Sequence, residues 1–293
     1  MNTQEITIPV PWGHISAKVY GNETNPAVLC VHGIQDNCDT FFKLMPLLPT
    51  DYYYICIDLP GHGLSAHFPQ HVPLEFINYL SVIKLIRDHF NWSQFVYLGH
   101  SFGGQLGSWF TSTYPEYIKC LIVLDTMGPR SVDCNITKQN VRTRIDDFQA
   151  LQSRQKGRDP PVYTYNQAIE KIKSSRPSKL TDESVHILAK RSLIKVNNES
   201  FKFSYDQRLK LQIHPLMTFD QQKNILSHLS CPILFVLADE NCGRYSNYLK
   251  NAYEFYSTHP KVTINYVNGD HSVHLNYPDR VFTHILKFLK QYY

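Results

Sequence analysis

The stretch Gly99-His100-Ser101-Phe102-Gly103 contains a serine with a glycine two positions away on each side. It follows an apolar run at residues 95–98 and opens a run at residues 102–114 whose pattern is helical. A serine on such a strand-to-helix turn sits in strained backbone, and glycines at these positions let the turn close. The stretch therefore predicts that Ser101 is a nucleophile at the end of a buried strand. The alternative is a tight turn in which the serine is incidental.

Short apolar runs alternate with helical patterns on both sides of this stretch. Runs of apolar and β-branched residues predict strands at residues 6–10, 15–20, 27–31, 53–57, 95–98, 120–124, 232–237 and 262–267. Helical patterns occupy residues 41–48, 74–90, 102–114, about 245–256 and about 281–292. Strands and helices that alternate at this spacing predict an α/β protein with a doubly wound, mostly parallel sheet.

The alternation stops between residues 129 and 230, where the sequence is polar and helical in character. We therefore expect a helical cap at 129–230, inserted between two parts of an α/β core at 1–128 and 231–293. The predicted cap carries 18 Lys and Arg against 10 Asp and Glu, a net charge of +8, whereas the remainder has a net charge of −4. The excess of positive charge in the predicted cap either keeps a helical surface solvated or attracts anionic substrates.

Composition excludes several other classes of protein. Of the 293 residues, 43% are apolar and 18% charged, so the chain can bury a large core and is not a disordered protein. The net charge of +4, without a run of five Lys or Arg, argues against a nucleic-acid partner. No run approaches the roughly 18 apolar residues of a membrane span. We expect a soluble, cytoplasmic protein without an integral membrane segment, and the sequence leaves its oligomeric state open.

A nucleophilic serine needs a base, and position selects one of the 14 histidines. His271, in Gly269-Asp270-His271, follows the last predicted strand. The carboxyl ends of parallel strands share one sheet edge, so His271 and Ser101 are expected at the same edge. His274 is better interpreted as a packing or polar residue of the following helix. Without an HExxH motif or a Cys/His cluster, we expect no metal and no cofactor.

An oxyanion hole for this serine requires two backbone N–H groups. One is expected from Phe102, at the start of the helix. The other is expected from Ile34, in the loop His32-Gly33-Ile34-Gln35 that follows the strand at residues 27–31. His32 is interpreted as a residue that braces this loop through hydrogen bonds.

The cysteines support a reduced, intracellular protein. The chain has seven, and several lie within apolar runs, at Cys30, Cys56, Cys120 and Cys231. Disulfide frameworks of secreted proteins pair their cysteines in loops, so these positions predict buried free thiols.

The chain resembles the α/β-hydrolase superfamily and, more narrowly, the serine hydrolase-like protein family. The superfamily resemblance is carried by His32-Gly33, Asp58-Leu59-Pro60-Gly61-His62-Gly63-Leu64-Ser65, Gly99-His100-Ser101-Phe102-Gly103-Gly104 and Gly269-Asp270-His271. The narrower resemblance is carried by Val10-Pro11-Trp12-Gly13-His14-Ile15, His32-Gly33-Ile34-Gln35-Asp36-Asn37, Leu47-Leu48-Pro49 and Leu124-Asp125-Thr126. The resemblance covers nearly the whole chain, is weakest across residues 129–230, and implies the α/β-hydrolase fold.

The chain departs from the superfamily pattern at the acid that would orient His271. Many α/β-hydrolases place this acid in a turn after the strand that corresponds to residues 232–237. Here that turn reads Ala238-Asp239-Glu240-Asn241, with Asn at the usual place of the Asp. Asp125, at the end of the strand after the nucleophile strand, is the preferred candidate, and Asp239 is the alternative.

These features predict a serine hydrolase that cleaves a small-molecule carboxylic ester or thioester through an acyl-enzyme intermediate. Epoxide hydrolases and dehalogenases resemble this chain with Asp at position 101, so the serine disfavours both. The alternative from another class is a ligand-binding receptor or pseudoenzyme on the same fold, because a fold does not determine function.

Overall fold

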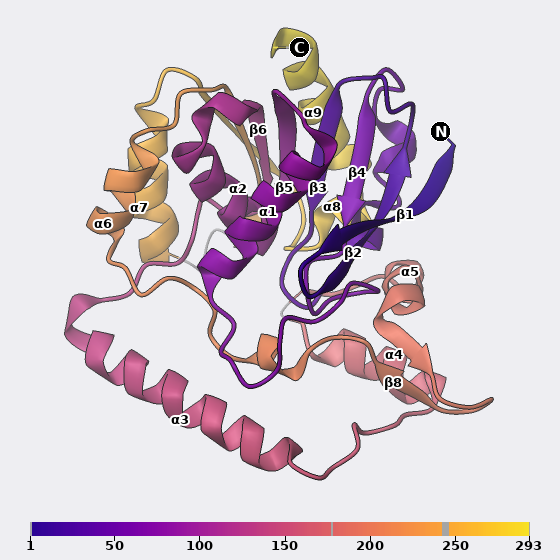
Figure 1. The fold of residues 1–293 in the computed structure, drawn as a ribbon. Coiled ribbons are helices and arrows are strands. Elements are labelled where there is room, and N and C mark those ends of the chain that lie inside the picture. The colour runs from indigo at the N-terminus through magenta and orange to yellow at the C-terminus, as the bar shows by residue number, and fades with distance from the viewer. Residues whose placement is uncertain (1, 177, 242–245, 293) are drawn as a thin grey trace.

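The computed structural model describes residues 2–176, 178–241 and 246–292, and an eight-stranded sheet forms its centre (Figure 1). The strands are β1 (Thr3–Val10), β2 (Gly13–Tyr20), β3 (Ala27–Val31), β4 (Tyr53–Ile57), β5 (Phe95–His100), β6 (Ile118–Leu124), β9 (Ile233–Ala238) and β10 (Val262–Val267). Their order across the sheet is β1-β2-β4-β3-β5-β6-β9-β10. The β1–β2 and β2–β4 pairs are antiparallel, and all other pairs are parallel. The predicted doubly wound, mostly parallel sheet is confirmed.

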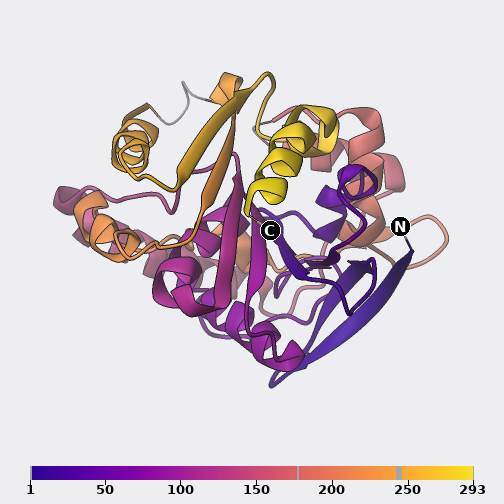
Figure 2. The ribbon, with the colours of Figure 1, turned by 90° about the horizontal axis from the view of Figure 1, so that it is seen from above.

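Helices cover both faces of this sheet, as the view from above shows (Figure 2). The covering helices are α1 (Phe76–Phe90), α2 (Phe102–Thr113), α7 (Ser246–Ser257) and α9 (Asp279–Tyr292). Residues of α1, α2 and α7 pack in one core cluster with Leu29 and Val31 of β3. Residues of α9 pack in the other cluster with Val28 and Cys30 of the same strand. Successive residues of a strand point to opposite faces, so a strand covered on both sides must be apolar throughout.

Buried thiols occupy several of these strand positions. Cys30, Cys56, Cys120 and Cys231 are buried and free, as predicted. Cys30, Cys56 and Cys120 pack as small apolar side chains within β3, β4 and β6, and Cys231 lies just before β9.

The sequence pattern at residues 41–48 predicts a helix, and there the prediction is wrong. The segment instead contains two short 3-10 helices, Cys38–Phe41 and Met45–Leu47. Pro46 has no N–H to donate, and a proline disfavours helical geometry at the residue before it. The other predicted helices are present within a few residues, although Tyr245, at the predicted start of α7, lies outside the described residues.

The segment between β6 and β9 is mainly helical and also contains a small hairpin. Its elements are α3 (Thr137–Gln155), α4 (Tyr165–Ser174), α5 (Asp182–Ser192), β7 (Leu193–Lys195), β8 (Phe201–Phe203) and α6 (Phe219–Leu226). Helices α3, α4 and α5 lie below the sheet in Figure 1, whereas α6 lies beside α7 and its Leu226 joins the core. We call residues 129–230 the inserted segment. Its treatment as a separate cap between residues 1–128 and 231–293 stays a prediction.

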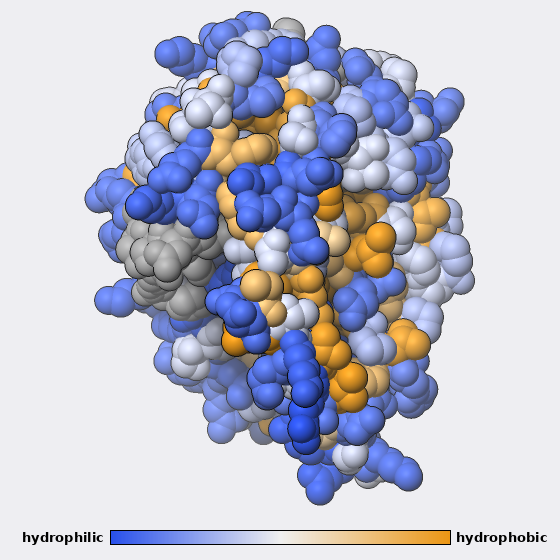
Figure 3. All heavy atoms as spheres, turned by 90° about the vertical axis from the view of Figure 1, so that its left-hand side faces the viewer, coloured by the Kyte–Doolittle hydropathy of each residue, from blue (hydrophilic) through white to orange (hydrophobic). Residues whose placement is uncertain are grey.

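The surface on the α3, α6 and α7 side is mostly hydrophilic, with hydrophobic side chains gathered in a strip toward the middle and right of the view (Figure 3). On and beside α3, Ile136, Val141 and Ile145 are exposed. Among the described residues, no helix has the length and apolar character needed to cross a bilayer.

Candidate active site

Ser101 lies in the tight turn between β5 and α2, with φ of 50° and ψ of −114°. A non-glycine residue with positive φ is strained and persists only where its surroundings fix it. A Cβ on Gly99 would lie 2.5 Å from backbone atoms of Gly103, and a Cβ on Gly103 would lie 2.1 Å from the carbonyl oxygen of Val31. Both glycines are therefore required for the turn to close, as the motif predicts.

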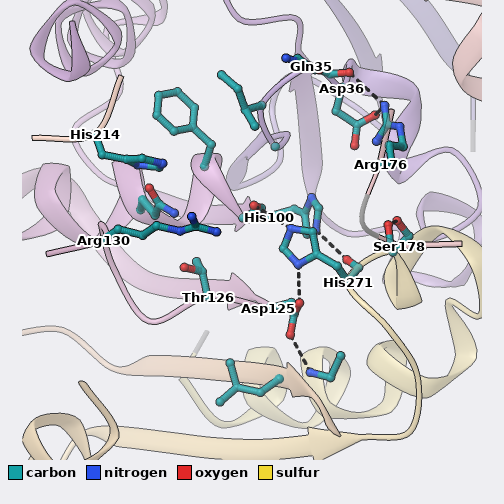
Figure 4. Close-up of a pocket in the computed structure, with 18 of the residues that line it drawn as sticks. Gln35, Asp36, His100, Asp125, Thr126, Arg130, Arg176, Ser178, His214 and His271 are labelled. Carbon is teal, nitrogen blue, oxygen red and sulfur yellow. Dashed lines mark hydrogen bonds and ion pairs between the residues drawn. The ribbon is translucent and has the colours of Figure 1, made fainter. Parts of the chain in front are cut away.

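The structure brings Ser101, His271 and Asp125 into one hydrogen-bond chain. Figure 4 shows the part of this chain that joins His271 to Asp125. His271 Nε2 lies 2.8 Å from Ser101 Oγ, and His271 Nδ1 contacts Asp125 Oδ2. The three residues follow β5, β10 and β6, whose carboxyl ends share one edge of the sheet. This is the arrangement in which a histidine can remove a proton from a serine while a carboxylate orients it.

Asp125 is held in place by the neighbouring strand. Its N–H donates to the carbonyl of Val236 at 2.8 Å, and its Oδ1 accepts from the N–H of Ala238 at 2.8 Å. The residue is 8% exposed and has a positive φ of 54°. These bonds fix the carboxylate so that its second oxygen faces His271.

Asp239, the alternative acid, has different partners. Its Oδ1 accepts from the N–H of Gly269 at 3.0 Å, and its Oδ2 lies 3.5 Å from the side-chain amide of Asn268. Asp239 therefore braces the loop that leads to His271, and the contact with the imidazole is made by Asp125.

The two residues whose amides are expected to form the oxyanion hole share a cavity with Ser101. Ile34 and Phe102 line the same cavity as the serine. Within the described residues, neither backbone N–H donates to a protein acceptor. Phe102 is the first residue of α2, where helix N–H groups lack intrahelical partners and attract negative charge.

The chain is also similar in sequence to known proteins. The family described as the alpha/beta hydrolase fold matches residues 26–182. A serine hydrolase-like protein from Danio rerio is 33% identical over 98% of this chain and 88% of its own length. Serine hydrolase-like protein 2 from Homo sapiens is 32% identical over 98% of this chain and 94% of its own length. The chain belongs to this family of α/β hydrolases.

The fold of this hydrolase also matches that of solved structures. A hypothetical protein from Pseudomonas aeruginosa PAO1 superposes with a TM-score of 0.85, covering 99% of this chain and 98% of its own. At 23% identity this match concerns the fold alone. The family resemblance read from the motifs is confirmed by these comparisons.

Two buried histidines shape the loop of this hydrolase that carries Ile34. His32 Nδ1 donates to the Gly33 carbonyl at 2.7 Å, and its Nε2 accepts from the N–H of Leu59 at 3.0 Å. His62 Nε2 accepts from the N–H of Gln35 at 3.0 Å. Burial lowers the pKa of both rings, and each ring acts as donor at one nitrogen and acceptor at the other, which is the neutral form. The bracing role expected for His32 is confirmed, and the sequence reasoning did not anticipate the matching role of His62.

His100 is a further site residue that sequence reasoning did not assign. Its Nε2 donates to the backbone carbonyl of His271 at 2.9 Å, and its ring centroid lies 3.9 Å from that of His274. His274, in α8 (Val273–Asn276), is buried and bonds Thr40 Oγ1 at 2.7 Å, so its expected role as a packing or polar residue is confirmed. Burial lowers the pKa of His100 well below its ordinary value and that of His274 to about 4. Both rings therefore support the His271 loop as neutral groups.

Ser101 faces a cavity of about 230 Å³ that residues of the inserted segment help to line. His214 and Arg130 lie on one side of His271, and Arg176 and Asp36 lie on the other (Figure 4). Arg176 donates to the Gln35 carbonyl at 2.9 Å and lies 3.5 Å from Asp36 Oδ1. No motif marks Arg130, Arg176 or His214, and the only sequence signal for the two arginines is the positive charge of the inserted segment. Within the described residues, no group of three or more His, Cys, Asp or Glu side chains is arranged to hold a metal ion.

Proposed function

We propose that this hydrolase cleaves a small-molecule carboxylic ester or thioester through an acyl-enzyme intermediate. The observation that carries the proposal is the hydrogen-bond chain from Ser101 through His271 to Asp125. Ser101 is the nucleophile, His271 the general base and Asp125 the acid, while the amides of Ile34 and Phe102 bind the oxyanion. An intact chain of these three groups is the arrangement used for acyl transfer.

In the first half of the reaction, His271 Nε2 takes the proton of Ser101 as Oγ attacks the substrate carbonyl carbon. The carbonyl oxygen becomes an oxyanion, which accepts hydrogen bonds from the two amides. The tetrahedral intermediate collapses when the bond to the alcohol or thiol breaks and His271 returns its proton to that leaving group. Ser101 is then acylated.

In the second half, water occupies the place of the leaving group. His271 removes a proton from the water as it attacks the acyl carbon, and the second tetrahedral intermediate collapses with return of that proton to Ser101 Oγ. The products are the free acid and the original enzyme. Asp125 stabilises the imidazolium that forms in each half and keeps the Nδ1 proton directed at its own carboxylate.

A fluorophosphonate probe and a panel of esters and thioesters test this proposal. Wild type should be labelled and should hydrolyse at least one neutral ester, and Ser101→Ala should lose labelling and at least about 10³-fold in kcat. The matched control is Ser178→Ala, because Ser178 lines the same cavity and bonds Ser272 at 2.7 Å.

Two outcomes would contradict the proposal. Turnover by Ser101→Ala within tenfold of wild type would remove the nucleophile assignment. Ligand binding by a wild type that is neither labelled nor active would favour the receptor alternative.

A further inference from the structure

A second cavity, of about 260 Å³, adjoins the one that contains Ser101. The two cavities meet at four residues that line both: Ile34, Phe102, Arg130 and His214. Two of these residues carry the amides proposed to bind the oxyanion. A substrate whose carbonyl lies at Ser101 can therefore extend past these amides into the second cavity.

The walls of this second cavity are positively charged. Arg130, Arg144 and Lys210 line it, and none of its described lining residues is Asp or Glu. The catalytic cavity differs, because its two carboxylates, Asp36 and Asp125, contact Arg176 and His271. Cations that share one wall repel each other unless an anion lies between them.

Arg144 has two partners that give it a structural role in the cavity wall. Its guanidinium donates to the carbonyl of His214 and lies 3.7 Å from Glu75, so Arg144 holds the cavity wall together. Burial and the charges of Arg130 and Arg144 lower the pKa of His214 to about 4, which leaves this histidine neutral at cellular pH.

Lys210 is surrounded by positive rather than negative charge. Its Nζ donates to Gln207 Oε1, a neutral group, at 2.6 Å. Its pKa is lowered by burial and then by the charges of Lys171 and Arg154, so an anion beside it would be stabilised by several cations at once. A lysine whose only role is to keep a surface soluble does not need other cations beside it.

The positive surface continues beyond Lys210. Lys210 also lines a third cavity, of about 1050 Å³. Further cations of the inserted segment line that cavity as well: Arg154, Lys156, Arg158, Lys202 and Arg208. Of its two carboxylates, Asp206 is paired with Arg208 at 2.6 Å, which leaves Asp159. The charge excess of the inserted segment is thus concentrated along a path that begins at the catalytic cavity.

We propose that the second cavity binds an anionic group of the substrate, a carboxylate or a phosphate, against Lys210 and Arg130 while the scissile carbonyl lies at Ser101. The proposal rests on the proposed function, since it assigns a substrate class to the same site. It selects between the two interpretations of the basic segment, because solvation does not require cations in a cavity beside the nucleophile.

Binding to Ser101→Ala, measured by titration calorimetry, tests this site without turnover. One pair of ligands is mono-p-nitrophenyl glutarate and its neutral methyl ester, which differ by a carboxylate in the acyl portion. The other pair is acetyl phosphopantetheine and acetyl pantetheine, which differ by a phosphate in the thiol portion. The pair that shows a charge preference identifies the source of the anion.

We expect the anionic member of one pair to bind about three- to fivefold more tightly than its neutral partner, because Lys210 and Arg130 are exposed and an exposed ion pair contributes an effect of this size. Adding Lys210→Gln should remove that preference. Adding Lys223→Gln should leave the preference unchanged. This substitution removes the same charge from the inserted segment, but Lys223 lines none of the three cavities.

The outcomes separate this inference from the proposed function. Equal affinity within both pairs, or an equal effect of Lys210→Gln and Lys223→Gln, would overturn the anion site. Hydrolysis of neutral esters by wild type in that case would leave the proposed function standing. A charge preference without any turnover of esters or thioesters would retain the anion site and overturn the proposed function.

Discussion

Two carboxylates lie at the carboxyl ends of the neighbouring strands β6 and β9, near His271, and their contacts give them different roles. Asp125 contacts His271 Nδ1, while Asp239 accepts from the N–H of Gly269 at 3.0 Å. An Asn at position 125 can still accept from the N–H of Ala238, so the loop is retained, but it supplies no charge to an imidazolium. The asymmetry makes the acid assignment testable with two substitutions of equal size.

We expect Asp125→Asn to lower kcat for a neutral ester by on the order of 10⁴, because the imidazolium loses its counter-charge and the neutral ring loses the carboxylate that fixes its tautomer. Asp239→Asn should lower kcat by less than about tenfold. Steady-state kinetics measures both, with thermal unfolding as the check that each variant is folded. The reverse ranking of the two variants would assign the acid to Asp239.

Motif residues near Ser101 were predictable because their chemistry constrains the backbone. The spacing of Gly99, Ser101 and Gly103 encodes a turn that other residues cannot make, and the position of His271 follows from strand order. Arg130 and Arg176 were not predictable, because a long basic side chain in a helical segment has the same local pattern whether it faces water or a cavity.

At the scale of elements, strands were predicted more reliably than the connections between them. β3 and β4 are buried along their whole length, so each is a continuous apolar run that no other environment favours. At residues 41–48 the apolar spacing of a helix is present, and Pro46 still prevents an α-helix from forming. Here local backbone chemistry outweighs the apolar pattern.

Helix α5 is attached to the sheet by a buried ion pair. Arg191, which is 3% exposed, donates to Asp58 Oδ2 from Nε at 3.0 Å and from Nη2 at 2.7 Å. Asp58 also accepts from the N–H groups of Cys38 and Leu64. This carboxylate therefore joins the inserted segment to two loops of the core.

We expect Arg191→Met to lower the free energy of unfolding by about 3–5 kcal/mol, because it leaves the buried Asp58 carboxylate without its cation. Urea unfolding measures the loss. The control is Lys173→Met on α4, where the pair with Asp182 is at the surface and its removal should leave the midpoint unchanged. A loss no larger than that of the control would show that the pair does not attach α5 to the core.

Across the whole molecule, several histidines are buried in their neutral form around the edge of the sheet that carries Ser101. His32, His62, His100 and His274 are at most 3% exposed, and burial is the first cause that lowers the pKa of each. Together they hold the loop that carries Ile34 and the His271 loop in place. The same feature makes the stability of the fold sensitive to acid. At low pH the histidines of the unfolded chain bind protons that the buried neutral rings do not bind, which favours unfolding.

For His274 the direction of the stability change and its pH range follow from a pKa of about 4 in the folded protein and about 6.5 in the unfolded chain. Its contribution to stability is complete above pH 6.5 and is lost as the pH falls toward 4. At pH 5 this one ring should lower the free energy of unfolding by about 2 kcal/mol relative to pH 7. Urea unfolding measures how much free energy of unfolding is lost between pH 7 and pH 5. This loss should be smaller by about 2 kcal/mol in His274→Gln than in wild type. An unchanged loss in the variant would mean that His274 is not held neutral by the fold.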